Sequence, residues 1–352
     1  MGKQGVKKLS YGLSLVLSIM LAFLTICGSY AGNFHPKESP TLAWIGLLLP
    51  GLLLANMLVF VLWLLKRKCY CILPLVAIAW NFEFILSVLH YSKEKQTMAH
   101  VLTVATYNIH SFNEDYTGYT TQKIAHFMKR EQVDIICFQE YNWNKFLPKK
   151  TIDRLFGLYP FHSAPTHNGK ARIAVYSKYP ILKQGFYPFK GTDNCVMFTD
   201  LQTPHKTIRI FNVHLQTTNF NASRHQIAKR KSFGAENSEI AKEITGSLQH
   251  NQTLRANQVN FVKREAKKSP YPTILCGDFN DLPSSYTYKH LMGDFTDGFR
   301  EVGCGYEYTF KGLFHLFRID YILHSPTLKC ISYQSHKDLK YSDHHPVIAR
   351  FQ

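Results

Sequence analysis

The chain has 352 residues, 45% of them hydrophobic, and carries 41 lysine and arginine residues against 24 aspartate and glutamate residues. This length allows two domains, and no repeat or low-complexity tract occurs, which excludes a repeat protein. The formal net charge of +17 excludes a strongly acidic protein and favours polyanionic partners such as nucleic acid, phosphorylated metabolites or anionic lipid headgroups, although a solvated basic surface without a specific partner has the same composition.

The N-terminal quarter is apolar, and the composition changes near residue 95. Residues 9–34 and 39–65 contain no charged side chain, and a third apolar segment, residues 70–91, contains only Glu83. Each segment is long enough to cross a hydrocarbon core, which takes roughly 20 residues. We therefore expect residues 1–95 to form a membrane anchor with three transmembrane helices, at about 9–32, 41–65 and 70–91.

Basic residues at the start of the chain and in the short loops set the expected orientation. Lys3, Lys7 and Lys8 precede the first segment and residues 66–68 are all basic, whereas the first loop carries only Lys37 against Glu38. Both basic clusters are expected in the cytoplasm, and three spans then place the rest of the chain outside it. Two further lysines, Lys93 and Lys95, lie on the wrong side for this rule. A cleaved signal peptide is the alternative for the first segment, but a small-residue cleavage site followed by soluble sequence is missing.

Residues 100–352 alternate short apolar runs with polar segments. Val, Ile, Thr and aromatic content predicts strands at 101–109, 133–140, 172–181, 195–202, 207–216, 273–276, 317–324 and 344–351. Apolar residues at helical spacing predict helices at 120–132 and 255–268. Many strands with few helices between them favour an α/β sandwich of two packed sheets with helices outside. Residues 217–254 are polar and too long for an ordinary loop, and fit a lid, a surface helix or disorder.

The eight cysteines give no strong framework, and no Cys-x-x-Cys metal motif occurs. Cys137 and Cys276 lie in apolar runs and are expected to be small buried residues. Cys195, Cys304 and Cys330 would be able to pair in an oxidising compartment, but the sequence selects no pairing.

Polar residues that suit catalysis occur where the predicted strands begin or end. They are Asn108, Glu140, His214, Asp278, Asn280, Asp320, Asp343 and His344. Asp278 and Asn280 follow the run 273–276 directly, and on their own they also fit an ordinary turn. Residues at strand ends converge if the strands share a sheet. The cost of grouping charge is offset when a cation and a phosphate complete the cluster.

These residue types fit the hydrolysis of a phosphate ester. A hard divalent cation such as Mg²⁺ takes oxygen ligands, and it neutralises the charge that develops on the phosphate. We expect Glu140 to be the principal ligand, with Asn108 beside it and Asp343 as a shared ligand. Taken alone, Glu140 would be read as a surface carboxylate.

A water nucleophile needs a base, and histidine titrates near neutral pH. His344 is placed for this role, and Asp320 would hold its other nitrogen. Asp278 and Asn280 would align the water and the phosphate oxygens. His214 would donate to a phosphate oxygen or protonate the leaving group, although alone it would be read as a half-buried histidine.

Seven short motifs occur in the order seen in the endonuclease/exonuclease/phosphatase superfamily, which the chain resembles over roughly residues 100–352. They are TYNI (106–109), CFQE (137–140), AVYSKYPI (174–181), NVHL (212–215), GDFND (277–281), RIDYI (318–322) and SDHHPV (342–347). The resemblance implies a four-layer α/β sandwich and Mg²⁺-dependent phosphoester hydrolysis, with Mn²⁺ as the alternative cation. It implies a metal site at Asn108, Glu140 and Asp343.

The same resemblance assigns catalytic positions: His214, Asp278 and Asn280 to phosphate handling and water alignment, and Asp320 with His344 to the base. Arg172 and Tyr176 are the candidate substrate contacts. Arg172 departs from the family, because relatives commonly have glycine there, and it would be able to bind phosphate itself.

The leading functional hypothesis is a membrane-anchored, outward-facing, Mg²⁺-dependent phosphoesterase, either a phosphodiesterase of nuclease type or a phosphomonoesterase. A lipid-headgroup phosphodiesterase of sphingomyelinase type is the first alternative, because the anchor holds the site near the bilayer. Phe310, Phe314 and Phe317, beside Lys311 and Arg318, would then face the membrane or stack on bases, or else they belong to the core. A non-catalytic membrane protein that binds a phosphorylated ligand is the second alternative, and no protein partner is predicted.

Overall fold

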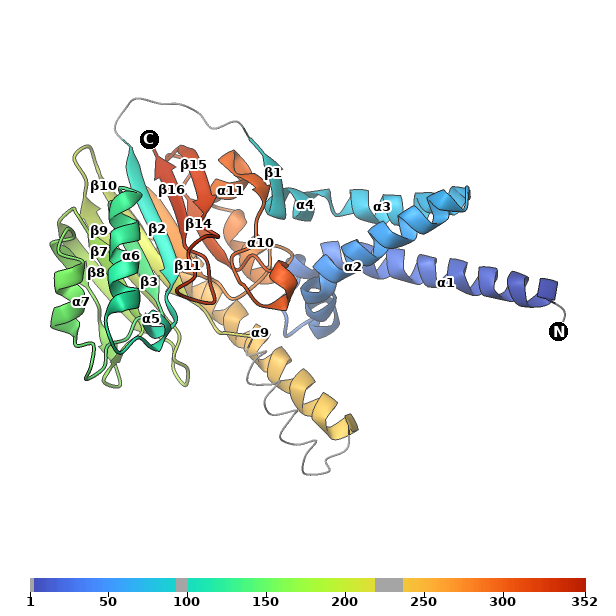
Figure 1. The fold of residues 1–352 in the computed structure, drawn as a ribbon, viewed down its shortest axis with the longest axis horizontal. Coiled ribbons are helices and arrows are strands. Elements are labelled where there is room, and N and C mark those ends of the chain that lie inside the picture. Colours follow the sequence, from blue (N-terminus) through green and yellow to red (C-terminus); the bar gives the residue numbers. More distant parts are fainter. Residues whose placement is uncertain (1–2, 93–100, 219–236) are drawn as a thin grey trace. The chain divides into compact units, whose positions relative to one another are not determined.

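The computed structural model describes residues 3–92, 101–218 and 237–352, and the chain divides into two compact units (Figure 1). The helical unit comprises the chain up to Ser87 together with Leu282–Lys289. The second unit comprises Val88–Asp281 and His290–Gln352.

Two helices of the first unit are long and apolar enough to cross a membrane. They lie within α1 (Lys3–Ser29) with η1 (Ala31–Asn33), and in α2 (Pro40–Leu65). The expected third span is broken: η2 (Cys69–Cys71) and α3 (Ile72–Trp80) are followed by α4 (Phe82–Val88) after a bend of 61°. Residues 89–91 form the strand β1 instead of the end of a helix. The structure therefore supports two spans, or three if the bent pair counts as one.

Polar side chains link the apolar helices of this unit. Asn56 donates to the hydroxyl of Thr25 at 2.6 Å, and the indole of Trp63 donates to Ser18 at 2.9 Å. Asn81 donates to the carbonyls of Thr25 and Ala77, each at 3.0 Å. Asn81 lies at the break between α3 and α4, so the residue that interrupts the third segment also ties it to α1.

The second unit is built on two six-stranded mixed sheets. One has the order β12-β14-β11-β10-β9-β8, and the other β15-β16-β2-β3-β7-β4 (Figure 1). The strands of the first are Thr296–Asp297, Asp320–His324, Thr273–Asp278, Thr207–His214, Cys195–Gln202 and Ile181–Pro188 in that order. The strands of the second are Cys330–Ser335, Val347–Phe351, Leu102–Asn108, Ile135–Gln139, Ile173–Ser177 and Phe161–Ser163. Two small ribbons, β1 with β13 (Cys304–Tyr306) and β5 (Thr166–His167) with β6 (Lys170–Ala171), complete the described strands.

A buried apolar cluster fills the space between the two sheets. Val104, Cys137 and Val175 come from one sheet, and Ile210 and Cys276 come from the other. A second cluster lies between the outer face of the β2–β3–β7 sheet and the helices α5 (His110–Glu114), α6 (Tyr119–Arg130) and α7 (Lys149–Leu155). The predicted α/β sandwich of two packed sheets flanked by helices is confirmed. The expected burial of Cys137 and Cys276 is also confirmed, and all eight cysteines are free.

Helix α9 (Asn237–Lys267) contains the predicted helix 255–268 but begins much earlier. The polar tract 217–254 is therefore helical from residue 237 onward, while residues 219–236 lie outside the described part of the chain. Phe261 of α9 packs against Tyr187 of β8, with ring centroids 5.1 Å apart, and thereby covers the outer face of the other sheet. The remaining helices are α10 (Tyr286–Met292), α11 (Gly298–Val302) and η3 (Leu313–His315).

Candidate active site

Strand register brings the predicted residues of one sheet into a single row. In the parallel pair β10–β11, His214 lies opposite Asp278, and in the antiparallel pair β11–β14, Asp278 lies opposite Asp320. In the other sheet, Asn108 lies opposite Gln139 at the ends of the parallel strands β2 and β3. The predicted convergence occurs, but it joins the edges of two packed sheets rather than one shared sheet.

The backbone at this edge adopts conformations that few residues tolerate. Gly277 has φ 144°, and a Cβ atom there would lie 1.9 Å from the carbonyl oxygen of Val213, so only glycine fits. Glu140 and Asn280 have φ of 50° and 54°. This left-handed region is uncommon for residues with a side chain, and it concentrates at functional sites.

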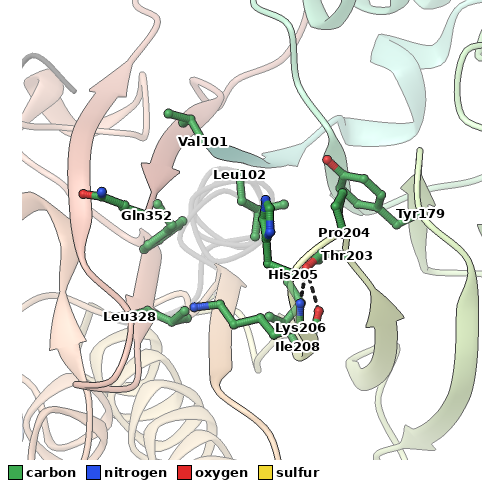
Figure 2. Close-up of a pocket in the computed structure, with 11 residues that line it drawn as sticks. Val101, Leu102, Tyr179, Thr203, Pro204, His205, Lys206, Ile208, Leu328 and Gln352 are labelled. Atoms are coloured by element: carbon green, nitrogen blue, oxygen red, sulfur yellow. Dashed lines mark hydrogen bonds between the residues drawn. The ribbon is translucent and has the colours of Figure 1, made fainter. Parts of the chain in front are cut away.

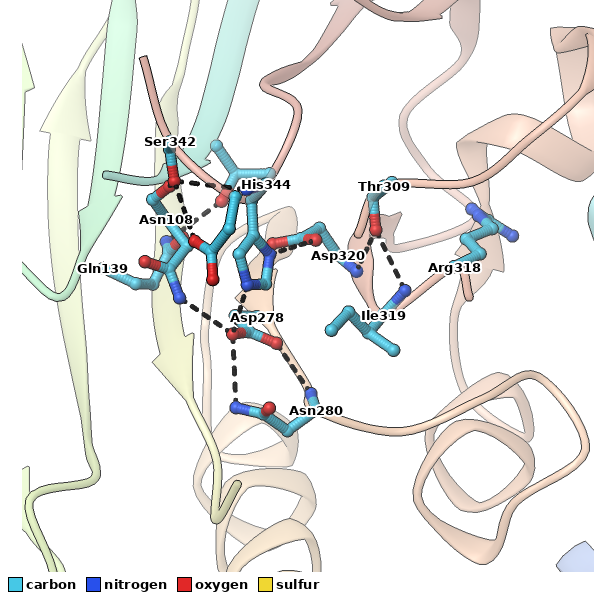
Figure 3. Close-up of polar contacts among 12 residues, drawn as sticks. Asn108, Gln139, Asp278, Asn280, Thr309, Arg318, Ile319, Asp320, Ser342 and His344 are labelled. Atoms are coloured by element: carbon cyan, nitrogen blue, oxygen red, sulfur yellow. Dashed lines mark hydrogen bonds and ion pairs between the residues drawn. The ribbon is translucent and has the colours of Figure 1, made fainter. Parts of the chain in front are cut away.

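His344 lies between two buried carboxylates (Figure 3). Its Nδ1 is 2.9 Å from Oδ2 of Asp320, and its Nε2 is 3.8 Å from Oδ2 of Asp278. The hydroxyl of Thr309 accepts the backbone N–H of Asp320 at 3.0 Å, which fixes the strand that carries the carboxylate. The ring of Phe310 lies 5.2 Å from the imidazole of His344 and closes one side.

The electrostatics of this row favour a proton on the histidine. Burial alone would lower the pKa of His344, but the charges of Asp320 and Asp278 outweigh it and raise the pKa to about 10. Burial raises the pKa of Asp278 to about 7 against the charge of His344, and the charge of Asp320 adds to the rise. Burial also lowers the pKa of His214.

Asn108 connects the two sheets at the site. Its amide nitrogen donates to Oδ2 of Asp278 at 3.0 Å (Figure 3). The same nitrogen donates to Oε1 of Glu140 at 3.1 Å. Its amide oxygen accepts the backbone N–H of His110 at 3.1 Å. The hydroxyl of Ser342 donates to the backbone carbonyl of Asn108 at 2.7 Å, which holds the segment before His344 against β2.

The carboxylates of Glu140 and Asp343 both lie near the imidazole of His110. Nδ1 of His110 lies 3.4 Å from Glu140 and 3.8 Å from Asp343. Burial would raise the pKa of Glu140, but the hydrogen bond from His110 and the charge of His214 outweigh it and lower the pKa to about 2. Glu140 is therefore ionised at every physiological pH.

The donor set fits a hard divalent cation. Carboxylate oxygens, which Glu140 and Asp343 offer here, are the ligand type that Mg²⁺ and Mn²⁺ prefer. Asn108 instead turns its amide nitrogen to Glu140. Ligand atoms of Glu140, His214 and Asp278 also lie within 4.8 Å of one another. Two buried polar atoms of the cluster, Nδ1 of His214 and Oδ1 of Asp320, make no hydrogen bond within the described residues.

Of the remaining predicted site residues, Asn280 and Arg172 lie near the group around Asp278 and His214, and Tyr176 does not. Asn280 donates to Asp278 at 3.2 Å and to the carbonyl of Leu215 at 3.0 Å. Arg172 is ion-paired with Asp193 at 2.6 Å, and its charge contributes to the lowered pKa of His214.

Tyr176 is the residue that the structure does not bring to the cluster. Its side chain is fully buried in the outer apolar cluster, and its hydroxyl bonds to Tyr141 and Asp153, each at 2.8 Å. Alternation along β7 explains the difference, because neighbouring residues of a strand point to opposite faces. We therefore do not retain Tyr176 as a substrate contact.

The sequence did not single out His110 or the polar pair beneath the site. Gln139 donates to Asn212 at 2.7 Å, and Asn212 donates to the carbonyl of Phe138 at 2.9 Å, which joins the sheets directly below Glu140 and His214. Both amides lie inside the motifs CFQE and NVHL, next to apolar residues. An amide within such an apolar run was the signal in the sequence that could have indicated a buried polar contact. His110 follows the motif 106–109 directly, and only its position next to Asn108 marked it.

A cavity of about 340 Å³ opens at the other end of the same strands (Figure 2). Its wall includes Leu102, which begins β2, and Phe351, which pairs with Leu102 in β16. It also includes Thr203 and Ile208 at the β9–β10 turn. None of the candidate active-site residues lines this cavity. We therefore locate the site by its catalytic side chains and not by the volume of a cavity.

Comparisons with known proteins agree on the second unit. Residues 105–344 match the model of the Endonuclease/Exonuclease/phosphatase family, and residues 10–88 match a family described only as a domain of unknown function. No curated protein sequence matches the chain.

Several solved structures share the fold. They include an endonuclease/exonuclease/phosphatase from Beutenbergia cavernae (18% identity, 72% of each chain, TM-score 0.52), a humanized D. rerio TDP2 with 14 mutations (14% identity, 72% of this chain and 99% of that one, TM-score 0.53) and a mannosyl-6-phosphatase from Bacteroides thetaiotaomicron (18% identity, 71% and 99%, TM-score 0.50). At these identities the similarity establishes the fold alone.

Proposed function

The chain belongs to the endonuclease/exonuclease/phosphatase family, whose members hydrolyse phosphate esters, and from this we propose that it is a membrane-anchored, divalent-metal-dependent phosphodiesterase. The observation that carries the proposal is the convergence of Glu140, Asp278 and His344 from three distant parts of the sequence onto one edge of the sandwich. A group of this kind, with an accessible metal-type carboxylate beside a buried histidine–aspartate pair, suits hydrolysis and exceeds what ligand binding alone requires.

The metal would be held by Glu140, with Asp343 as a further oxygen donor and with Asn108 beside Glu140, which it holds through its amide nitrogen. Bound there, Mg²⁺ or Mn²⁺ would supply positive charge to the phosphate and to the leaving oxygen. Glu140 suits this role because its pKa of about 2 keeps the carboxylate ionised.

The group formed by Asp320, His344 and Asp278 would activate water. Asp320 holds Nδ1 of His344, so Nε2 is the nitrogen that faces the reacting groups. The sequence motif indicates His344 as the general base, but the carboxylates around it raise its pKa and favour its protonated form. Asp278, whose pKa of about 7 lies near neutral pH, is therefore the other candidate for the group that accepts the proton of the water. Asn280, whose amide donates to Asp278, would help to align the water. His214, whose pKa burial lowers, would donate an N–H hydrogen bond to a phosphate oxygen.

Substrate class is proposed on charge and family together. The chain from residue 100 onward carries 32 lysine and arginine residues against 21 acidic ones, which suits a polyanion such as nucleic acid. Arg172, three-quarters buried and ion-paired with Asp193 near His214, would contact a substrate phosphate. The similar mannosyl-6-phosphatase indicates that the same fold also serves a monoester.

A lipid-headgroup diester is the second candidate, and a surface feature favours it. Phe314 in η3 is 91% exposed, with Leu313 and Tyr306 also exposed nearby in the sequence. Phe310 of the same segment contacts His344. Aromatic and aliphatic side chains of this kind suit a membrane interface.

The outward orientation is also part of the proposal. Lys289, beyond the apolar segments in the sequence, contacts Ser29 and Asn33 at the end of α1 that is opposite to Lys3. This contact supports a location of the segment Leu282–Lys289 on the side away from both basic clusters.

The test uses the full chain in lipid nanodiscs with bis-p-nitrophenyl phosphate. Hydrolysis should require Mg²⁺ or Mn²⁺, stop with EDTA and return when the metal is restored. DNA, RNA, sphingomyelin vesicles and inositol phosphates are then compared: steep loss of activity with added salt indicates a nuclease, whereas preference for vesicles indicates the lipid enzyme. Absence of hydrolysis with every substrate and both metals would leave only the binding alternative.

A further inference from the structure

The segment Leu282–Lys289 belongs to the helical unit, although the chain on both sides of it belongs to the other unit. It directly follows the stretch Asp278–Asp281, which contributes Asp278 and Asn280 to the candidate active site. Four side chains of the segment are almost completely buried: Leu282, Ser284, Thr287 and Tyr288. The segment is thus not an exposed loop.

Polar contacts tie the segment to the loop after α1 and to α2. Nζ of Lys289 donates to the backbone carbonyl of Ser29 and lies 3.3 Å from Oδ1 of Asn33. The hydroxyl of Ser284 donates to the backbone carbonyl of Gly46 at 2.8 Å. The acceptors on Ser29 and Gly46 are backbone carbonyls. These two contacts therefore depend on the backbone conformation of the helices and not on their side chains.

Close packing at two glycines gives independent support. A Cβ atom on Gly32 would lie 2.6 Å from the backbone oxygen of Ser285 and 2.5 Å from Cδ of Lys289. A Cβ atom on Gly46 would lie 2.4 Å from Cβ of Ala31, in the same loop region. Since side chains do not approach this closely, the segment meets the loop after α1 only because Gly32 lacks a side chain, and this loop meets α2 only because Gly46 lacks one.

The other end of the stretch is fixed within the second unit. Oδ2 of Asp281 is paired with Nε of the fully buried Arg255 at 2.9 Å, and the backbone carbonyl of Asp281 accepts the hydroxyl of Tyr321 at 2.8 Å. Asn280 donates to the carbonyl of Leu215. The chain is therefore held at Asn280 and Asp281 and again from Leu282 onward, with no free residue between.

We propose that the apolar helices position the catalytic loop as well as anchoring the chain: they hold residues 282–289, and through this segment they keep Asp278 and Asn280 in the geometry for reaction. This role would belong to the part of the chain whose matched family has no known function. The inference rests on the proposed hydrolase function. Gly32, Ser284 and Lys289 are its positioning residues, and none of them touches substrate.

The test compares Gly32→Ala with Gly51→Ala in the full chain in nanodiscs. Gly51 is a matched control because a Cβ atom there meets nothing within 4 Å. Lys289→Met is a milder second variant, and Lys289→Arg is its conservative partner. Two quantities are measured: kcat and KM for bis-p-nitrophenyl phosphate, and amide hydrogen exchange over residues 278–289.

We expect Gly32→Ala and Lys289→Met to lower kcat about 10- to 100-fold with little change in KM, because a small misplacement of reacting groups is costly. Both should speed amide exchange at residues 278–289, while Gly51→Ala keeps wild-type values and Lys289→Arg restores part of kcat. Unchanged kcat in both variants, or faster exchange without loss of kcat, would overturn the inference. If the wild type hydrolyses nothing, the proposed function fails, and exchange at residues 278–281 alone decides whether the helices order the loop.

Discussion

The imidazole of His344 is held between two carboxylates, and this arrangement determines which nitrogen faces the reacting groups. Asp320 contacts Nδ1 at 2.9 Å, and Asp278 lies 3.8 Å from Nε2. The longer separation leaves Nε2 without a direct hydrogen bond to Asp278. A group placed in this way can exchange a proton with a substrate or a water molecule, whereas Nδ1 is committed to orientation.

Individual site residues were predicted from the sequence because they lie in short motifs with a fixed order. Seven of the eight strand-end residues take part in hydrogen bonds or close ion pairs with one another, and Asp343 joins them through His110. The prediction that Tyr176 contacts substrate was wrong, because a motif gives the residue type but does not say to which face of the strand the side chain points. His110 was missed because no partner for it can be read from the sequence.

Glu140→Gln tests the metal site at this scale. The substitution keeps the shape of the side chain but removes the charge that a divalent cation needs, so Mn²⁺ affinity should fall about 10- to 100-fold, in the range typical of metal-site substitutions. Titration calorimetry of the full chain measures this affinity, and Asp338→Asn, at an exposed carboxylate, is the control. Equal Mn²⁺ affinity in wild type and Glu140→Gln would remove Glu140 from the site.

Glu307 gives a prediction for stability against pH. Burial raises the pKa of this carboxyl to about 7 despite the nearby charge of Arg318. Since its pKa in the folded state lies above the unfolded value of 4.5, its stabilising contribution is complete below about pH 4.5 and is lost as the pH rises through 7.

Glu307→Gln imitates the protonated form and should therefore be more stable than the wild type at pH 8, by about 1–3 kcal/mol, but not at pH 5. Chemical unfolding of the full chain at the two pH values measures the difference. Glu243→Gln, at an exposed position, should show none. A stability gain for Glu307→Gln that is the same at both pH values would show that charge is not its cause.

At the scale of elements, the site depends on the parallel pair β10–β11. The two strands approach so closely at Gly277 that the carbonyl of Val213 occupies the place of a side chain. This approach puts His214 opposite Asp278 and leaves Asp278 at the edge of the sheet. A glycine before the acidic motif is therefore a packing requirement as well as a turn residue.

Gly277→Ala should break this pairing. A contact of 1.9 Å with backbone cannot be relieved by rotating a side chain, so we expect a loss of about 4 kcal/mol or more of unfolding free energy. Thermal unfolding followed by circular dichroism measures it, with Gly293→Ala as the control, because a Cβ there makes only ordinary contacts. A melting temperature for Gly277→Ala equal to that of Gly293→Ala would mean that β10 and β11 are not paired as described.

Elements were predictable where residue patterns are local. Helix α6 has Ile124, Phe127 and Met128 on one buried face, and it was found within two residues of its ends. For the first half of α9 the sequence leaves a lid, a surface helix and disorder open, because residues 237–254 contain few buried apolar side chains, Ile240 and Leu248 among them, and their periodicity is weak. The bend at Asn81 was also missed, because its partners lie on α1, far away in the sequence.

For the whole molecule, the distribution of basic residues in the sequence predicts the orientation across the membrane, whereas the fold does not determine it. Basic residues at 66–68 favour a cytoplasmic location for the turn after α2, whereas the later chain is expected outside. Two exposed cysteines lie on the two expected sides: Cys69 beside the basic cluster and Cys304 in β13.

A membrane-impermeant maleimide applied to intact cells should therefore label Cys304 and not Cys69. Surface labelling should disappear in Cys304→Ser and remain in Cys69→Ser, and both cysteines should react after permeabilisation. Surface labelling that depends on Cys69 instead would reverse the orientation.

The family and the two-sheet architecture were predictable because seven motifs in a fixed order constrain the whole second unit. The division of the chain into units was not fully predictable, because residues 282–289 pack with the helices through contacts to Ser29, Gly32 and Gly46, which no local pattern encodes. Contacts between distant segments are the part of a fold that composition and periodicity do not report.

The measurement that tests the account most directly is the hydrolysis of bis-p-nitrophenyl phosphate by the full chain carrying His344→Asn, with saturating Mg²⁺. His126→Asn, on the exposed face of α6, is the matched control. We predict a kcat for His344→Asn about 100- to 10,000-fold below the wild type, as for loss of a general acid or base, and an unchanged kcat for His126→Asn. A wild-type kcat in His344→Asn would show that the reaction, if it occurs, takes place without this histidine, and the proposed active site would be wrong.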